Sequence, residues 1–303
     1  ANISHEIRTP MNAIIGMTEL ALDAELAPDV YEYLQTVKMS AESLMTVIND
    51  VLDFSKIEAG KLDIECIQFN LQDAVSNAVS TLALRAHEKG LELSCHLPPH
   101  LPDVVVGDPG RLRQILVNLV SNAIKFTEQG EVVVHADVEK QTWNEVNLHF
   151  TVLDTGIGIP REKQGLIFEA FRQADGSTTR KYGGTGLGLS ISSRLIDLMG
   201  GRIWVESEVD RGTTFHFTLR LGLPEEPAPR VMPVNIDILK DLHVLVVDDN
   251  KTNRAILVEI LSSWRMKPVD ADSAFCAREI LERAAKDGAP FPLISLDSHM
   301  PGM

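Results

Sequence analysis

The sequence predicts three folds in succession: an all-α antiparallel helical hairpin, an α+β two-layer sandwich, and part of a doubly wound α/β domain. Apolar residues near the N-terminus recur every three or four positions, as they do on one face of a helix. After Gly60 the apolar and polar residues alternate, and a Pro-rich segment then precedes a βαβαβ pattern. We therefore expect domains over residues 1–60, 61–222 and 242–303, with a linker over 223–241.

The composition is that of a globular protein with an acidic surface. Of the 303 residues, 44% are hydrophobic and 23% are charged, and the formal net charge is −15. This charge disfavours nucleic acid or an anionic membrane as a direct partner, because both bind clustered Lys and Arg. No apolar run reaches the roughly 18 residues of a membrane span, so any membrane attachment should lie outside this stretch.

The cysteines point to a reducing compartment. The chain has three, Cys66, Cys95 and Cys276, and none forms a C-x-x-C pair. Neither a disulfide framework nor a zinc site is indicated by this spacing. We therefore expect a cytoplasmic location.

Two helices with one apolar stripe each are expected over residues 1–60. The stripe of the first helix consists of Ile3, Ile7, Pro10, Ile14, Met17 and Ala21. The second helix repeats the spacing between Val30 and Val51. A single hairpin cannot bury both stripes well, so we expect a homodimer that forms a four-helix bundle. A plain dimerisation coiled coil would show the same periodicity.

A histidine lies on the polar side of the first helix. His5 is about 200° from Ile3 around the helix axis. An exposed histidine can act as a nucleophile near neutral pH, and Glu6 beside it could orient the ring or take its proton. A metalloprotease is excluded because the string is H-E-x-x-T, ending at Thr9, rather than H-E-x-x-H. A solvated surface histidine is the alternative.

Residues 61–222 alternate between stretches with the apolar spacing of a strand, every second residue, and stretches with the spacing of a helix, every three or four residues. Strands are expected over residues 64–69, 91–97, 131–138, 146–153, 202–206 and 213–221, and helices over 71–89, 111–126 and 187–199. This order predicts a mixed sheet with helices packed on one face.

One expected helix in this region carries Asn118, Asn122 and Lys125 within reach of a single face. Carboxamide oxygens suit Mg²⁺, and an ammonium group suits phosphate oxygens. A metal-bound nucleotide could therefore lie on this face. By itself the pattern is weak, since a pair of asparagines often only caps or packs.

Two glycine-rich strings suit the rest of a nucleotide. Asp154 ends a strand and is followed by Gly156 and Gly158, so its carboxylate can accept a hydrogen bond from an exocyclic amine. The glycines of residues 183–188 open a helix, whose first amides can bind phosphate. The polar segment 177–182 between them has the composition of a lid.

The last part of the chain begins a parallel sheet. A strand over residues 243–247 ends in Asp248 and Asp249, and a strand over 293–296 ends in Asp297. Helical segments separate the strands, which is the pattern of a doubly wound fold.

Taken in order, these strings resemble those of hybrid sensor histidine kinases of two-component signalling. Residues 4–10, S-H-E-I-R-T-P, resemble the phosphoacceptor motif of that family. The segments 118–122, 154–158, 168–171 and 183–188 resemble the four boxes of its ATP site. The three aspartates near the C-terminus resemble the acidic pocket of a receiver domain.

The resemblance implies a protein-histidine kinase that uses ATP and Mg²⁺. His5 would take the phosphoryl group, Glu6 would accept a proton from its ring, and Thr9 would position water for dephosphorylation of a partner. Asn118 and Asn122 would hold Mg²⁺. The residues implied at the nucleotide are Asn118, Asn122, Lys125, Asp154, Gly156, Gly158, Phe168, Phe171, Gly184, Gly186, Leu187, Gly188 and Thr214.

The resemblance also implies a phosphorelay. Asp297 would receive the phosphoryl group from His5, with Asp248 and Asp249 holding a second Mg²⁺. Response regulators, receiver domains and histidine phosphotransfer proteins would be the partners. Receivers of this family also use a hydroxyl residue and a lysine on later strands, so we expect residues 242–303 not to complete the relay alone.

Two other functions fit some of the residues. An ATP-hydrolysing relative of the same fold would carry a glutamate where this chain has Asn118, and would lack the histidine hairpin. A non-catalytic scaffold would bind nucleotide and pass on only a conformational signal.

Overall fold

The structure is a computed structural model that describes residues 2–24, 26–170, 186–225, 238–297 and 300. In the first helix it describes side chains from Glu6 onward. These residues form two compact units, one made of residues 1–65 with 160–199 and one made of 66–159 with 200–303. Among the described helices, none is both long enough and apolar enough to cross a bilayer.

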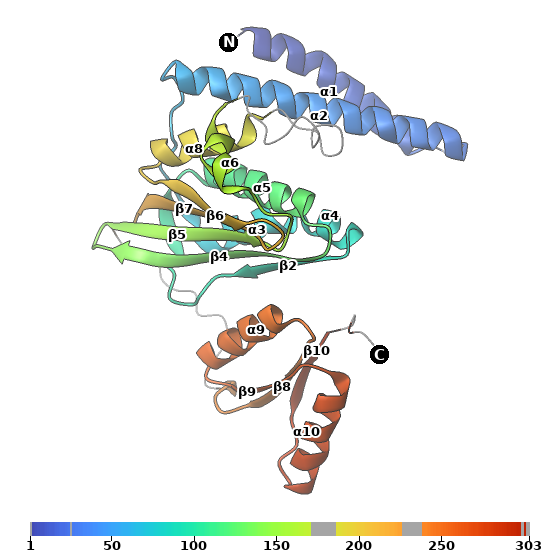
Figure 1. The fold of residues 1–303 in the computed structure, drawn as a ribbon, viewed down its shortest axis with the longest axis vertical. Helices are drawn as coiled ribbons and strands as arrows, with labels where there is room; N and C mark the ends of the chain where they lie inside the picture. Colours follow the sequence, from blue (N-terminus) through green and yellow to red (C-terminus); the bar gives the residue numbers. More distant parts are fainter. Residues whose placement is uncertain (1, 25, 171–185, 226–237, 298–299, 301–303) are drawn as a thin grey trace. The chain divides into compact units, whose positions relative to one another are not determined.

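The first unit is built on an antiparallel helical hairpin, as the sequence predicts (Figure 1). Helix α1 spans Asn2–Leu22 and helix α2 spans Pro28–Glu58. Pro28 begins α2, where the missing N–H and the fixed φ of proline suit the first helical turn. Arg8 Nη2 donates to Asn49 Oδ1 at 3.5 Å, and Lys38 Nζ lies 2.8 Å from Glu19 Oε1. These pairs join the two helices along their length.

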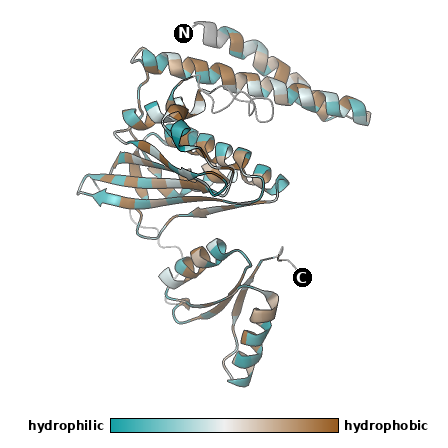
Figure 2. Cartoon of the chain, in the orientation of Figure 1, coloured by the Kyte–Doolittle hydropathy of each residue, from teal (hydrophilic) through white to brown (hydrophobic). Residues whose placement is uncertain are grey.

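One hairpin leaves much of its apolar stripe uncovered. Met11, which lies outside the expected stripe, and Ala41 are buried, but Ile14, Met17 and Leu44 are exposed in the single chain. Figure 2 shows apolar residues recurring along both helices. A row of exposed apolar side chains is typical of an interaction surface.

The first unit also contains three shorter elements: α6 (Arg161–Gln164), the 3₁₀-helix η1 (Leu166–Phe168) and α8 (Gly188–Leu198). The apolar face of α8 is buried through Ile191, Leu195 and Ile196. Arg194 Nη2 of α8 lies 4.0 Å from Glu58 Oε1 at the end of α2. The exposed pair contributes little by itself.

The second unit contains a seven-stranded sheet with β1-β3-β7-β5-β4-β2 as its order and β6 paired to β7. Its strands are β1 (Ile67–Asn70), β2 (Leu91–His96), β3 (Val104–Gly107), β4 (Gly130–Gln141), β5 (Glu145–Asp154), β6 (Ile203–Glu208) and β7 (Gly212–Gly222). Among the described pairs of this seven-stranded sheet, β2 and β4 are parallel and the others are antiparallel.

Helices α3 (Leu71–Ser80), α4 (Ala83–Glu88) and α5 (Pro109–Phe126) cover one face of this sheet (Figure 1). The strands alternate accordingly, so that Val134 is buried on the helix side while His135 is half-buried on the other side. Phe150 and Phe217 stack in the core with their ring centroids 4.8 Å apart. The expected two-layer sandwich is confirmed.

Two local features differ from the expectation. The single helix expected over residues 71–89 is two helices, which Thr81 and Leu82 separate; Thr81 Oγ1 donates to the Ala78 carbonyl at 2.7 Å in the last turn of α3. Strand β3 is not among the strands that the sequence predicts.

The C-terminal part of this unit is a three-stranded parallel sheet in the order β10-β8-β9. Its elements are β8 (His243–Val247), α9 (Lys251–Ser263), β9 (Lys267–Ala271), α10 (Ala274–Lys286) and β10 (Leu293–Leu296). Alternate residues of β8 enter two different cores. Leu245 packs in the core that holds Ala277 of α10, while Val244 packs in the core that holds Leu261 of α9. The two faces are therefore each covered by a helix, as in a doubly wound sheet.

Candidate nucleotide, phosphoacceptor and cation sites

The strongest candidate for nucleotide recognition is Asp154, the last residue of β5. Its side chain is buried, and its Oδ1 accepts a hydrogen bond from the Gly156 N–H at 2.9 Å. Burial raises the pKa of Asp154 to about 6, although hydrogen bonds from the backbones of Gly156 and Thr213 act in the opposite direction. A single carboxylate is thus held away from water with lone pairs to spare for another donor.

The loop after Asp154, residues 154–158, requires its glycines. A Cβ on Gly156 would lie 2.5 Å from the Phe126 carbonyl oxygen, and one on Gly158 would overlap the Glu208 carbonyl. Gly158 also has φ +70°, a conformation that other residues adopt at a cost. The backbone of this loop therefore packs closely on the structure beneath it.

Two hydroxyl groups support the same loop. Ser207 Oγ accepts from the Ile159 N–H at 2.7 Å and lies 3.0 Å from Thr213 Oγ1. Thr213 pairs with Asp154 across β5 and β7, so the two side chains share a face. Sequence reasoning missed Ser207, because only the pairing of β6 with β7 brings it to this place.

The structure does not bring Thr214 to this site. Thr214 pairs with Leu153, and alternate residues of a strand point to opposite faces of the sheet. Its side chain therefore lies on the face opposite Asp154. Thr213, its neighbour, supplies the hydroxyl on the Asp154 side.

Helix α5 presents the expected amide face. Asp108 caps its N-terminus by accepting from the Arg111 N–H at 2.9 Å, and Pro109 follows as the first helical residue. Asn118 and Asn122 are half-buried, and Asn122 Nδ2 lies 3.4 Å from Asn118 Oδ1. Each side chain has an amide oxygen that can bind a cation.

Lys125 is close to the end of α5 and to the loop. Burial lowers the pKa of its ammonium group, which lies 5.0 Å from the centre of the Phe126 ring. The Phe126 carbonyl accepts a hydrogen bond from the Ile157 N–H at 3.3 Å. The helix that carries Asn118, Asn122 and Lys125 is thus joined directly to the loop that carries Asp154.

The other expected nucleotide residues belong to the first unit. Phe168 ends η1, Gly186 has φ +69°, Leu187 is buried, and Gly188 opens α8. Phe171 and Gly184 lie outside the described residues, as does the expected lid over 177–182.

The phosphoacceptor candidate is in α1. His5 lies in the first turns of this helix, and its side chain is outside the described set. Glu6 and Thr9 are exposed on the same helix, and Pro10 continues it. His5, Glu6 and Thr9 therefore all lie on the first helix of the hairpin.

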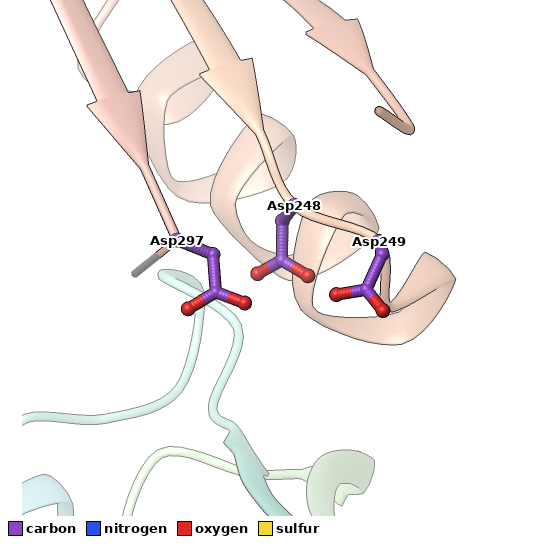
Figure 3. Close-up of side chains that lie close together, drawn as sticks. All are labelled: Asp248, Asp249 and Asp297. Atoms are coloured by element: carbon purple, nitrogen blue, oxygen red, sulfur yellow. The ribbon is translucent and has the colours of Figure 1, made fainter. Parts of the chain in front are cut away.

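A second carboxylate site lies at the carboxyl edge of the parallel sheet. Asp248 and Asp249 follow β8, and Asp297 follows β10; one oxygen of each lies within 4.8 Å of the other two. Figure 3 shows the three carboxylates converging from the ends of two strands. Burial raises the pKa of Asp248, and the charges of Asp297 and Asp249 raise it further. Three hard oxygen donors at this separation fit a divalent cation such as Mg²⁺.

Two known families match parts of this chain. Residues 1–60 match the His Kinase A (phospho-acceptor) domain. Residues 107–223 match the histidine kinase-, DNA gyrase B- and HSP90-like ATPase family.

Individual proteins extend this likeness. The signal transduction histidine-protein kinase BarA of Escherichia coli K12 is 44% identical over 269 residues, covering 89% of this chain and 29% of that protein. Sensor protein GacS of Pseudomonas syringae pv. syringae is 50% identical over 226 residues, covering 75% and 25%. This chain thus spans less than a third of either relative.

A solved structure is similar along nearly the whole chain. It is the crystal structure of full-length ShkA in complex with AMPPNP, with a TM-score of 0.73 and 26% identity over 99% of this chain and 69% of that one. Together with the two domain matches, these similarities show that the chain belongs to the hybrid sensor histidine kinases of two-component signalling.

Proposed function

We propose that this chain is the catalytic core of a protein-histidine kinase, in which ATP bound within residues 61–222 phosphorylates His5. One observation carries the proposal: Asp154 is a lone buried carboxylate on a glycine loop that is joined to the amide-bearing helix α5. Such a carboxylate suits a neutral donor such as the exocyclic amine of adenine. The Gly156 N–H already donates to Asp154 Oδ1, and the carboxylate has further lone pairs for such a donor.

The remaining contacts would divide between the cation and the phosphates. Asn122 and Asn118 would hold Mg²⁺ through their amide oxygens, and Lys125 would meet phosphate oxygens. The lowered pKa of Lys125 reflects the burial of its ammonium group, which an anion nearby would offset. Gly186, Leu187 and Gly188 would offer backbone N–H groups at the start of α8.

Bound ATP and Mg²⁺ would supply the γ-phosphoryl group in a charge-neutralised form. A neutral ring nitrogen of His5 forms the N–P bond while the P–O bond to the ADP leaving group breaks. Glu6 accepts the proton from the other ring nitrogen, which keeps the phosphorylated ring uncharged. Thr9, one turn further along α1, positions water when the reaction runs as dephosphorylation of a partner.

The phosphoryl group would then pass to an aspartate. Within this chain Asp297 is the candidate acceptor in a receiver-like domain over residues 242–303, and Asp248 and Asp249 would hold the Mg²⁺ that neutralises the acyl phosphate. Response regulators and histidine phosphotransfer proteins would be the next partners. The convergence of three carboxylates supports this assignment.

The hairpin would act as a homodimer in the cytoplasm. Its uncovered apolar stripe supports pairing with a second copy into a four-helix bundle. The unpaired cysteines fit a reducing compartment.

The test is incubation of the chain with γ-labelled ATP and Mg²⁺ beside a His5→Ala variant. The proposal predicts label that is lost in acid, stable in alkali, and absent from His5→Ala. Binding of ATP with no label on the protein would favour the scaffold, and release of labelled phosphate by wild type and His5→Ala alike would favour a hydrolase. Either result would contradict the kinase.

A further inference from the structure

One lysine outside the site described above makes an unusual set of contacts. Lys89 follows α4 and precedes Gly90, whose φ of +68° turns the chain into β2. Its Nζ donates to the carbonyl oxygens of Ile124 at 2.7 Å, Lys125 at 3.0 Å and Thr127 at 3.2 Å. An ammonium group has three N–H donors, so these three acceptors use all of them.

These contacts complete the C-terminus of α5. The last four carbonyls of a helix have no partner within it. Here Ala123 accepts from the Thr127 N–H and hydroxyl, and Phe126 accepts from the Ile157 N–H. The two carbonyls between them, those of Ile124 and Lys125, are bound by Lys89. A cation at this end also matches the partial negative charge of the helix terminus.

This helix end is where α5 meets the nucleotide loop. The Phe126 carbonyl lies so close to Gly156 that no Cβ would fit, and it bonds Ile157 in the same loop. A shift in the last turn of α5 would therefore move both Lys125 and the loop that carries Asp154. Lys89, which is not part of α5, holds that turn through its hydrogen bonds to the carbonyls of Ile124 and Lys125.

We infer that Lys89 is a positioning residue of the ATP site, which fixes the end of α5 so that Lys125 and the 154–158 loop keep the geometry that nucleotide requires. The inference rests on the proposed function, because it assumes that nucleotide binds at this loop. Lys89 is not itself in contact with Asp154, so its effect passes through the backbone of residues 124–127.

The experiment compares Lys89→Met, which keeps the length of the side chain but removes its donors, with Lys89→Arg, which keeps charge and donors. Lys140→Met is the matched control, since Lys140 is an exposed lysine of β4 for which the structure describes no polar side-chain contact. The readouts are the affinity for a fluorescent ATP analogue, and KM for ATP and kcat in the labelling of His5.

We expect Lys89→Met to raise KM for ATP and weaken analogue binding about five- to tenfold, with kcat at saturating ATP within about twofold of wild type. Lys89→Arg should recover at least half of the loss, and Lys140→Met should match wild type. If Lys89 only stabilised the fold, Lys89→Met would lower the unfolding temperature but would leave KM for ATP unchanged at temperatures where the protein is folded.

Three outcomes would overturn the inference. Lys89→Met could keep the wild-type KM and analogue affinity, or Lys89→Arg could lose as much as Lys89→Met. Failure of the wild-type chain to bind the analogue at all would instead contradict the proposed function, and the inference with it.

Discussion

The second unit places aspartates at the ends of strands in two different ways. Asp154 is alone in a glycine loop, where two backbone N–H groups donate to it. Asp248 has two further carboxylates, those of Asp249 and Asp297, with oxygens within 4.8 Å. Burial is the largest cause of the raised pKa at both Asp154 and Asp248, but only Asp248 also faces like charges.

This difference separates two kinds of chemistry for one residue type. A lone buried carboxylate has spare lone pairs and one negative charge, so it can select a neutral hydrogen-bond donor. Three converging carboxylates carry like charges and repel one another, and a divalent cation relieves that repulsion. The first arrangement suits the exocyclic amine of a nucleotide base, and the second suits a metal ion beside an acyl phosphate.

The largest expected effect is that of Asp154→Asn on nucleotide affinity. The substitution keeps the shape and an acceptor for Gly156, but removes the charge from the hydrogen bond to the exocyclic amine. We expect affinity for AMPPNP to fall about 30- to 100-fold, as for loss of a hydrogen bond to a charged group. Titration calorimetry would measure it. The control is Asp210→Asn, on an exposed residue with φ +62°, which Asn tolerates.

The same variant should be more stable than wild type without nucleotide. Because the folded-state pKa of Asp154 is raised, the protonated side chain stabilises the folded state. This contribution is fully present below pH 3.8 and is lost as pH rises through about 6. At pH 8 the asparagine should therefore add about 1 to 2 kcal/mol to the free energy of unfolding. A variant that binds AMPPNP normally, or that loses binding by unfolding, would contradict the role given to Asp154.

A smaller effect is expected for Asp248→Asn on cation binding. Removal of one of three carboxylates should weaken Mn²⁺ binding to the nucleotide-free chain about tenfold or more, and leave AMPPNP affinity unchanged. Asp287→Asn, on an exposed residue after α10, is the control. Equal Mn²⁺ affinities in all three proteins would show that the convergent carboxylates are not a cation site.

The smallest effect is the pH dependence of nucleotide affinity. Ionised Asp154 is the form that accepts from the exocyclic amine, and its pKa of about 6 means that acidification protonates it. Affinity for AMPPNP should be level above pH 7 and about tenfold weaker at pH 5. Asp154→Asn should flatten the profile; a profile unchanged by the substitution would assign the titration to another group.

Much of the difference between the two carboxylate sites can be predicted from the sequence. The ends of strands and the glycines after Asp154 are local patterns, and both carboxylate sites follow from them. The choice between Thr213 and Thr214 is not local, because it depends on which residue of β7 pairs with Asp154. A shift of one residue in that register exchanges the two hydroxyls.

Ser207 and Lys89 show a second limit of sequence reasoning. Ser207 reaches the loop through the pairing of β6 with β7, and Lys89 reaches the end of α5 from a turn 35 residues earlier in the chain. Neither contact has a pattern of its own in the sequence. The break in the expected helix over 71–89 is similar, since no glycine or proline marks it in the sequence.

The initial rate of His5 labelling by γ-labelled ATP in wild type, Asp154→Asn and Asp297→Asn would distinguish the roles of the two carboxylate sites. We expect Asp297→Asn to label His5 as fast as wild type, because the acidic site acts after the histidine, and Asp154→Asn to label it at least about tenfold more slowly at limiting ATP. Wild-type labelling in Asp154→Asn, or loss of acid-labile label in Asp297→Asn, would contradict the division of labour between the two carboxylate sites.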